Sequence, residues 1–366
     1  MLDEIGFSGQ LRLKQAKVCI VGLGGLGAPT AQKLAAMGVG HLRIVDRDVV
    51  SPSDLPRQYL YDADSIGYSK VEIAAKKLGM LNPNVKFDPV PASVTSSNGY
   101  EIVKGVDVVI DGLDSIETRY LINRACVNLG VPYVYAGAIE SQGNASTILP
   151  GKTPCLECIY PGLEDETLPK CSIVGVHPSI LSIVSGVQVS EAIRLLTGRQ
   201  PELLNKVLLI DLETLSFDKV KLTRHEKCPV CGEKPSEPPA PLKDRFFEEE
   251  CARSGKRTFV LTPKKHVDVD LKELLETLQA RGTKISAKGN LCLTFDYDSE
   301  LTVSVLKTGI MIAQLSPQKR LADPRQEIIE MYHSIMGRDL GIDRALLPDL
   351  PTATPYGEPH SSETNL

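Results

Sequence analysis

The sequence lacks a hydrophobic run long enough to cross a membrane. No uninterrupted apolar stretch reaches the roughly 20 residues that a membrane-spanning helix needs, although 42% of the 366 residues are apolar. The first ten residues are polar and contain a glycine, so the charged and then apolar pattern of a secretory signal is missing too. These absences predict a soluble protein of the cytosol, with no membrane partner.

A concentration of positive charge is also missing. Lys and Arg number 41 against 46 Asp and Glu, which gives a formal net charge of −5, and no Lys/Arg stripe stands out. Such a balance offers no electrostatic reason to bind a phosphodiester backbone. A nucleic acid is therefore not an expected partner.

Cysteine, in contrast, is well represented, with nine residues. In a reducing compartment these are more typical of metal ligands, nucleophiles or core residues than of disulfides. Four of them form two C-x-x-C pairs, Cys155 with Cys158 and Cys228 with Cys231. Two such knuckles are what a tetrahedral Zn²⁺ site needs, and four thiolates leave no open position for catalysis. We predict a structural zinc site; a redox C-x-x-C is the alternative, although that activity needs only one pair.

Composition divides the chain into several parts. Residues 1–234 form the first predicted domain, and 235–254 form a linker, because the stretch KPSEPPAP is too rich in proline for helix or sheet. A small α+β domain is predicted over 255–338. Residues 339–366 lack apolar periodicity at their end and are predicted to be a disordered tail.

The first domain alternates strand-like and helical runs. Strands are predicted over 17–22, 41–46 and 107–114, with helices over 28–37 and 70–81 between them. Near-continuous Val and Ile in these strands are typical of parallel strands buried on both faces, so the prediction is an α/β fold with a doubly wound, mostly parallel sheet. Later runs alternate in polarity and predict an antiparallel extension; they cover 131–138, 144–150, 206–213 and 216–222.

The second domain shows a shorter pattern. A helix is predicted over 271–280, followed by strands near 284–287, 291–296, 302–306 and 309–313. In a closing helix, Ile328, Tyr332 and Ile335 recur at helical spacing and predict one buried stripe. No catalytic constellation is evident in this domain.

A glycine-rich segment follows the first strand and opens a helix. Such glycines let the backbone turn tightly beside a phosphate, and the free N–H groups of the helix start favour an anion. Asp46, at the end of the next strand, is placed to accept hydrogen bonds from a ribose. The glycines of this fingerprint are Gly22, Gly24, Gly25 and Gly27. The motif alone fits an NAD-dependent dehydrogenase equally well.

The residues after Asp46 favour a triphosphate. Arg57 lies in the stretch 48–58, and Lys70 begins a predicted helix, so two cations converge near the glycine turn. Transfer of a nucleotidyl group must neutralise charge on the leaving pyrophosphate. Asp114, at the same edge of the sheet, is placed to hold Mg²⁺ through oxygen. The alternative is that Arg57, Lys70 and Asp114 are solvated surface residues.

At these residues the sequence resembles the ThiF/MoeB/ubiquitin-activating enzyme family. The resemblance rests on GLGGLG, VDRDVVSPSDLPRQ, Ser69-Lys70-Val71 and Asp114, and it covers about residues 6–232. It implies that both C-x-x-C pairs bind zinc and that Asp114 binds Mg²⁺. The chain departs from the family at Asp54, where members usually have Asn. The predicted ATP contacts are Gly22, Gly24, Gly25, Gly27, Asp46, Asp48, Ser53, Asp54, Arg57, Lys70, Asp114 and Ser115.

The resemblance also implies an activity. Members look like dimers that activate the C-terminal glycine carboxylate of a small protein with ATP, forming an acyl adenylate and pyrophosphate. Cys171, in Pro-Lys-Cys-Ser-Ile, resembles a segment whose cysteine takes the activated protein as a thioester. A thiolate is a good nucleophile toward an acyl adenylate. The alternative for Cys171 is a buried structural cysteine.

We therefore expect a two-step enzyme acting on a ubiquitin-like protein that ends in Gly-Gly. Arg57, Lys70 and Asp114 would serve adenylation, and Cys171 would form the thioester. The small C-terminal domain is similar in size and position to the ubiquitin-fold domain of activating enzymes, which implies docking of the carrier or a conjugating enzyme. The nearest alternative is adenylation of a sulfur carrier for molybdopterin, thiamine or tRNA thiolation. A non-catalytic zinc-stapled module is a further alternative.

Overall fold

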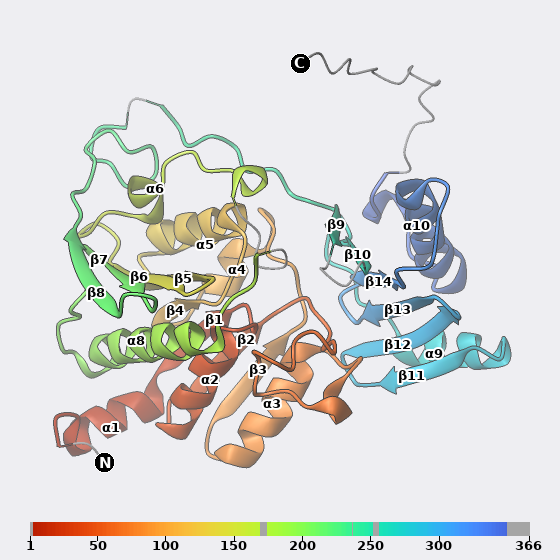
Figure 1. The fold of residues 1–366 in the computed structure, drawn as a ribbon, viewed down its shortest axis with the longest axis horizontal. Helices are drawn as coiled ribbons and strands as arrows, with labels where there is room; N and C mark the ends of the chain where they lie inside the picture. The colour runs from red at the N-terminus through yellow and green to blue at the C-terminus, as the bar shows by residue number, and fades with distance from the viewer. Residues whose placement is uncertain (1–2, 169–173, 236, 252–255, 350–366) are drawn as a thin grey trace.

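The computed structural model describes residues 3–168, 174–235, 237–251 and 256–349. It shows two units, each built around its own sheet (Figure 1). The first unit contains the glycine-rich segment and both C-x-x-C pairs. The second unit follows it in sequence and lies beside it.

The first unit contains an eight-stranded sheet in the order β3-β2-β1-β4-β5-β6-β7-β8. Strands β3 to β5 in this order run parallel, and β6, β7 and β8 add an antiparallel extension. The predicted fold class is confirmed. The strands are β1 (Lys17–Val21), β2 (His41–Val45), β3 (Lys86–Val90), β4 (Val108–Asp111), β5 (Tyr133–Ile139), β6 (Gln142–Ile148), β7 (Lys206–Asp211) and β8 (Ser216–Lys221).

Helices cover both faces of this sheet because its parallel strands are apolar on both sides. On β1, Val18 and Ile20 pack into one core, while Cys19 and Val21 pack into the other. The first face carries α1 (Gly6–Gln15), α2 (Gly27–Ala36), α3 (Lys70–Leu81) and α8 (Pro178–Thr197) (Figure 1). The second carries α4 (Gly99–Val103), α5 (Ile116–Leu129) and α6 (Leu156–Ile159).

Helix α8 is long and apolar enough to span a membrane by length and composition, and it is the one such helix in the described residues. It packs instead on β4, β5 and β6 and against α1 and α2. Its buried side chains include Gln188 and Glu191, which hydrogen-bond to the sheet and its loops. We therefore describe α8 as a core helix of the first unit.

The second unit contains an antiparallel six-stranded sheet in the order β11-β12-β13-β14-β10-β9. Helices α9 (Leu271–Ala280) and α10 (Pro324–His333) pack with it in a separate apolar core that includes Phe259, Val303 and Tyr332. The strands are β9 (Phe247–Cys251), β10 (Arg257–Leu261), β11 (Lys284–Lys288), β12 (Cys292–Asp298), β13 (Leu301–Leu306) and β14 (Met311–Leu315).

Two predicted boundaries differ from the structure. Strand β9 lies inside the stretch 235–254 that was predicted as a linker, because its Glu-rich sequence gains a strand conformation only by pairing with β10. The predicted tail also begins too early. Residues 344–346 form a short helix, and Leu347 is buried in the second core.

The two units contact each other beside the start of α3. Glu72 accepts hydrogen bonds from the backbone N–H groups of Asn290 (2.7 Å) and Leu291 (3.0 Å). The carbonyl oxygen of Gly67 accepts one from the Thr294 hydroxyl at 2.6 Å. A small apolar cluster joins the units; it consists of Val49, Val260, Cys292, Leu306, Ile310 and Ile312. The second unit therefore contacts and holds the residues on either side of Lys70.

Candidate active site

The glycine-rich turn connects β1 to α2. Gly22 has φ = +88°, a conformation that glycine adopts without strain. A Cβ at Gly27 would overlap the carbonyl oxygen of Gly22, so the helix can approach the strand this closely only with glycine there. The turn thus leaves the backbone and the start of α2 accessible at the edge of the sheet, where an anion is favoured.

Asp46 follows β2 and lies against this turn. One carboxylate oxygen accepts a hydrogen bond from the backbone N–H of Leu23 at 2.6 Å, and the other accepts one from the backbone N–H of Asp48 at 2.7 Å. Burial raises the pKa of Asp46 to about 6, with a further contribution from the nearby Asp48 carboxylate. A carboxylate fixed in this way still has lone pairs to accept hydrogen bonds from a ligand.

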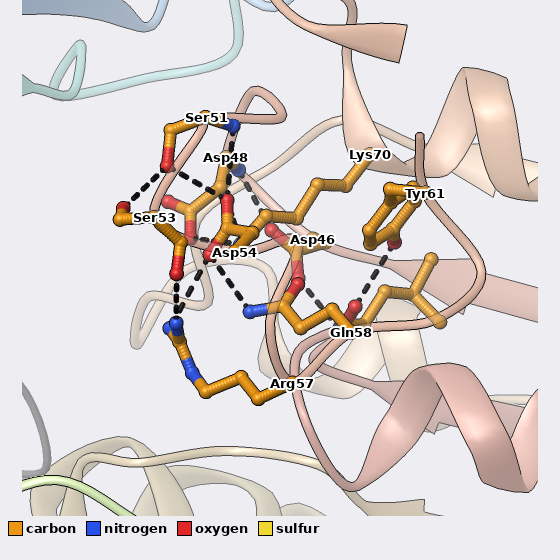
Figure 2. Close-up of polar contacts among 10 residues, drawn as sticks. Asp46, Asp48, Ser51, Ser53, Asp54, Arg57, Gln58, Tyr61 and Lys70 are labelled. Atoms are coloured by element: carbon orange, nitrogen blue, oxygen red, sulfur yellow. Dashed lines mark hydrogen bonds and ion pairs between the residues drawn. The ribbon is translucent and has the colours of Figure 1, made fainter. Parts of the chain in front are cut away.

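Asp54 organises the two predicted cations (Figure 2). It is buried, and it forms ion pairs with Arg57 at 3.3 Å and with Lys70 at 3.8 Å. Its carboxylate also accepts hydrogen bonds from the Gln58 amide at 2.8 Å and from the backbone N–H of Ser51 at 3.0 Å. Asp54 therefore fixes both cations on one wall of the site.

Lys70 is the more strongly fixed of the two cations. Its side chain is 5% exposed, and its ammonium group lies 3.0 Å from Asp48. Burial by itself would lower the pKa of Lys70, but the carboxylates of Asp48, Asp46 and Asp54 outweigh it and raise the pKa well above its usual value. Lys70 is thus a permanent positive charge. Arg57 is more open, at 36% exposed, and also donates to the carbonyl oxygen of Ser53 at 2.5 Å.

One cleft of about 1260 Å³ brings nearly all the predicted nucleotide contacts together. Gly27 does not line it, because that residue packs beneath the turn. The predicted residues that line the cleft are Gly22, Gly24, Gly25, Asp46, Asp48, Ser53, Asp54, Arg57, Lys70, Asp114 and Ser115. Their roles as ATP contacts stay predictions, but they face one common space.

The end of β4 differs from the prediction. The strand ends at Asp111, not at Asp114. Asp111 is fully buried and forms an ion pair with Arg119 at 3.0 Å and a hydrogen bond with the Tyr133 hydroxyl at 2.6 Å. Asp114 lies three residues further on, exposed at the cleft, and Ser115 caps α5. The end of β4 therefore carries a buried structural carboxylate, Asp111, and the loop after it carries an exposed one, Asp114.

Two residues at the cleft were missed from the sequence. Gln58 is buried beside Asp54, and its side-chain oxygen has no hydrogen-bond partner among the described residues. Its position directly after Arg57 is the feature of the sequence that could have identified Gln58 as a residue of the cleft. Arg47 lies between two predicted contacts and forms a bidentate ion pair with Glu248, a residue so distant in sequence that no pattern connects them.

Cys171 lies outside the described residues. The stretch that contains it is bordered by described residues on both sides, and Leu168 and Val176 line the cleft. Asp165, just before it, accepts hydrogen bonds from the hydroxyl of Ser115 at 2.7 Å and from the backbone N–H of Ile116 at 2.6 Å. The residues before this stretch are thus held beside Ser115, and those after it are held beside Glu140, to which Val176 forms a β-bridge.

The four predicted metal cysteines come together behind α5. Their sulfur atoms all lie within 4.8 Å of one another. The Cys155 and Cys228 sulfurs are 3.8 Å apart, and those of Cys158 and Cys231 are 3.4 Å apart. In a tetrahedral site with Zn–S bonds of about 2.3 Å the sulfurs are about 3.8 Å apart. The cluster therefore fits a tetrahedral metal ion, and its four thiolates would fill every position.

The first unit is an α/β fold whose cleft lies at the edge of its sheet, beside the glycine turn. The model of the ThiF family matches residues 1–230, and the chain belongs to this family. The chain is therefore an enzyme of the adenylyltransferase class. The resemblance inferred from the motifs is thereby confirmed.

Particular relatives are similar over most of their length. The SAMP-activating enzyme E1 of Haloferax volcanii is 40% identical over 255 residues, which cover 69% of this chain and 93% of that one. The sulfur carrier protein adenylyltransferase of Thermus thermophilus is 37% identical over 243 residues, covering 65% and 90%. In a crystal structure, Escherichia coli MccB shares the fold with a TM-score of 0.57 and 24% identity, covering 63% of this chain and 69% of that one.

Proposed function

We propose that the chain uses ATP to adenylate the C-terminal carboxylate of a small ubiquitin-like carrier protein. A carboxylate oxygen of the carrier would attack the α-phosphorus, and the bond from that phosphorus to the pyrophosphate oxygen would break. The products would be an acyl adenylate and pyrophosphate. The observation that carries this proposal is that Arg57, Lys70 and Asp114 line the same cleft as the glycine turn.

Each part of the cleft suits a part of this reaction. Arg57 and Lys70 supply positive charge where the pyrophosphate would leave, and fixed charges need no reorganisation during the reaction. Asp114 offers oxygen ligands of the kind Mg²⁺ prefers, and the metal would neutralise the phosphates. Asp46 would accept hydrogen bonds from the ribose. We further propose that the four-cysteine cluster holds Zn²⁺ as a structural ion.

Isotope exchange between pyrophosphate and ATP tests the proposal. Exchange should appear only when a carrier ending in Gly-Gly is added, because the reverse reaction needs the acyl adenylate. A carrier shortened by its terminal glycine is the matched control and should support none. The absence of exchange with all ubiquitin-like and sulfur-carrier proteins tried would argue against carrier adenylation.

Sulfur transfer is the favoured use of the activated carrier. The Thermus relative is a sulfur carrier protein adenylyltransferase, and a third relative, the adenylyltransferase and sulfurtransferase MOCS3 of Sus scrofa, is 36% identical over 280 residues. The chain covers 62% of the length of that protein. These names support the sulfur-carrier alternative better than conjugation, which was the leading expectation from the sequence.

Thioester formation on Cys171 is the second candidate. It is supported by the name of the Haloferax relative, an activating enzyme E1, and by Leu168 and Val176, which lie on either side of the Cys171 stretch and line the cleft. The thiolate would attack the acyl carbon and release AMP. We predict that incubation with ATP, Mg²⁺ and carrier gives a thiol-sensitive adduct that Cys171→Ala abolishes, while pyrophosphate exchange is retained. The matched control is Cys126→Ala, because Cys126 is a buried residue of α5 that does not line the cleft. An adduct that survives Cys171→Ala refutes this role.

The ribose role of Asp46 predicts a pH dependence. The pKa of its carboxyl group is about 6, so lowering the pH through 6 protonates it and removes a charged acceptor. ATP affinity should therefore fall below pH 6. Calorimetric titration of wild type and Asp46→Asn separates this effect from titration of the phosphates, because the variant lacks the group but binds the same ligand. Parallel pH profiles for the two proteins would contradict the prediction.

A further inference from the structure

The segment 240–248, which we call the strap, connects the two units and lies beyond the family match (Figure 1). It is tied to the first unit at two neighbouring residues, Asp244 and Arg245. Asp244 accepts hydrogen bonds from the backbone N–H and the hydroxyl of Ser96, both at 2.6 Å. The next residue, Arg245, forms ion pairs with Glu117 at 2.9 Å and Glu166 at 2.7 Å. A proline-rich connection would not need such anchoring.

Further contacts fix the two ends of the strap. The Arg124 guanidinium donates to the carbonyl oxygen of Ala240 at 2.6 Å. Glu248, where the strap enters β9, forms the bidentate ion pair with Arg47, with one of its N–O distances at 3.1 Å. Arg47 directly follows Asp46 in sequence. The strap thus runs from α5 to the residue beside the proposed ribose contact, and the part of it that lines the cleft comprises Leu242, Lys243, Asp244, Arg245 and Glu248.

The strand order indicates which end of the cleft the strap borders. Asp46 follows β2, the glycine turn follows β1, and Asp114 follows β4, so phosphates between the turn and Asp114 would lie on the β4 side of Asp46. The base of the same nucleotide must then lie on the other side of the ribose. That side is formed by the residues after β3 and by the strap, including Ser93 and Val94.

The chemistry of this end suits a purine. Val94 and Leu242 come from two separate segments, are half-buried against the same core, and both line the cleft. Apolar side chains of this kind contact the faces of a planar ring in most small-molecule sites. We infer that the strap completes a base subsite of the nucleotide cleft, with Leu242 in contact with the base and Asp244 as a positioning residue. This inference rests on the proposed use of ATP.

Calorimetric titration of the full-length chain tests the base subsite. The ligands are ATP and inorganic tripolyphosphate, each with Mg²⁺, because the second has phosphates but no base. Leu242→Ala and Asp244→Ala should each weaken ATP binding about tenfold, equivalent to about 1.4 kcal/mol. Both should leave tripolyphosphate binding within about twofold, since the phosphate end is untouched. Leu242→Met, which keeps the apolar contact, should restore most of the ATP affinity.

Glu237→Gln is the matched control, because Glu237 is an exposed carboxylate in the same connection and does not line the cleft. It should change neither affinity. Unchanged ATP affinity in both strap variants would overturn the inference, and so would equal losses for the two ligands. Failure of the proposed function is a separate outcome: pyrophosphate exchange would then be absent with every carrier even though the strap variants discriminate the two ligands.

Discussion

Asp114→Ala should lower carrier-dependent pyrophosphate exchange by about 10²–10³-fold, the range typical for removal of one electrostatic contact to a transition state. The reason is the exposed position of Asp114 at the cleft, where it makes no hydrogen bond or ion pair with any described residue. A carboxylate at the cleft with no hydrogen bond or ion pair of its own in the described part of the chain is available to a metal ion.

The absence of hydrogen bonds and ion pairs at Asp114 within the described residues also means that a loss of activity in the variant can be told apart from a loss of stability. Because Asp114 makes no hydrogen bond or ion pair with a described residue and acts on Arg119 only as a weaker charge than Asp111, the variant should keep a melting temperature and a metal content close to those of the wild type. Asp64→Ala is a suitable control, since Asp64 is also exposed but lies away from the cleft. Full exchange activity in Asp114→Ala would remove this residue from the proposed metal site.

Cys228→Ser should cause the largest loss of stability. Structural zinc sites contribute about 10–16 kcal/mol of binding free energy in small domains, and the cluster here joins the segments at 155–158 and 228–231, which are far apart in sequence. Loss of one ligand should release most of the metal and lower the melting temperature by about 10 °C or more, since each kcal/mol is worth about 2–4 °C at this size.

Metal content and melting temperature should be measured on the same preparations. Cys126→Ala is the matched control, because Cys126 belongs to the same apolar core but lies outside the cluster. It should lose stability through its cavity and keep its zinc. One zinc ion per chain in Cys228→Ser, together with an unchanged melting temperature, would contradict a structural role for the cluster.

The sequence determined the parts of this protein that are local or strongly periodic. The glycine turn before α2, Asp46 after β2 and the helix that begins at Lys70 follow from short-range patterns, and the structure has these elements where they were predicted. The two C-x-x-C pairs could be predicted as metal ligands because a zinc knuckle keeps its two ligands close in sequence. The grouping of the four sulfurs follows from the chemistry of thiolates, and the structure brings them together.

Tertiary structure decided the features that depend on distant partners. Strand β9 carries consecutive glutamates, which favour no strand by themselves, and it forms because β10 offers an edge to pair with. The strand predicted to reach Asp114 ends at Asp111, which is buried against Arg119. The sequence of the strap resembles a linker, but in the structure its contacts with Ser96 and Glu117 hold it in place. In each case the deciding contact joins residues too far apart in sequence for any local pattern to connect them.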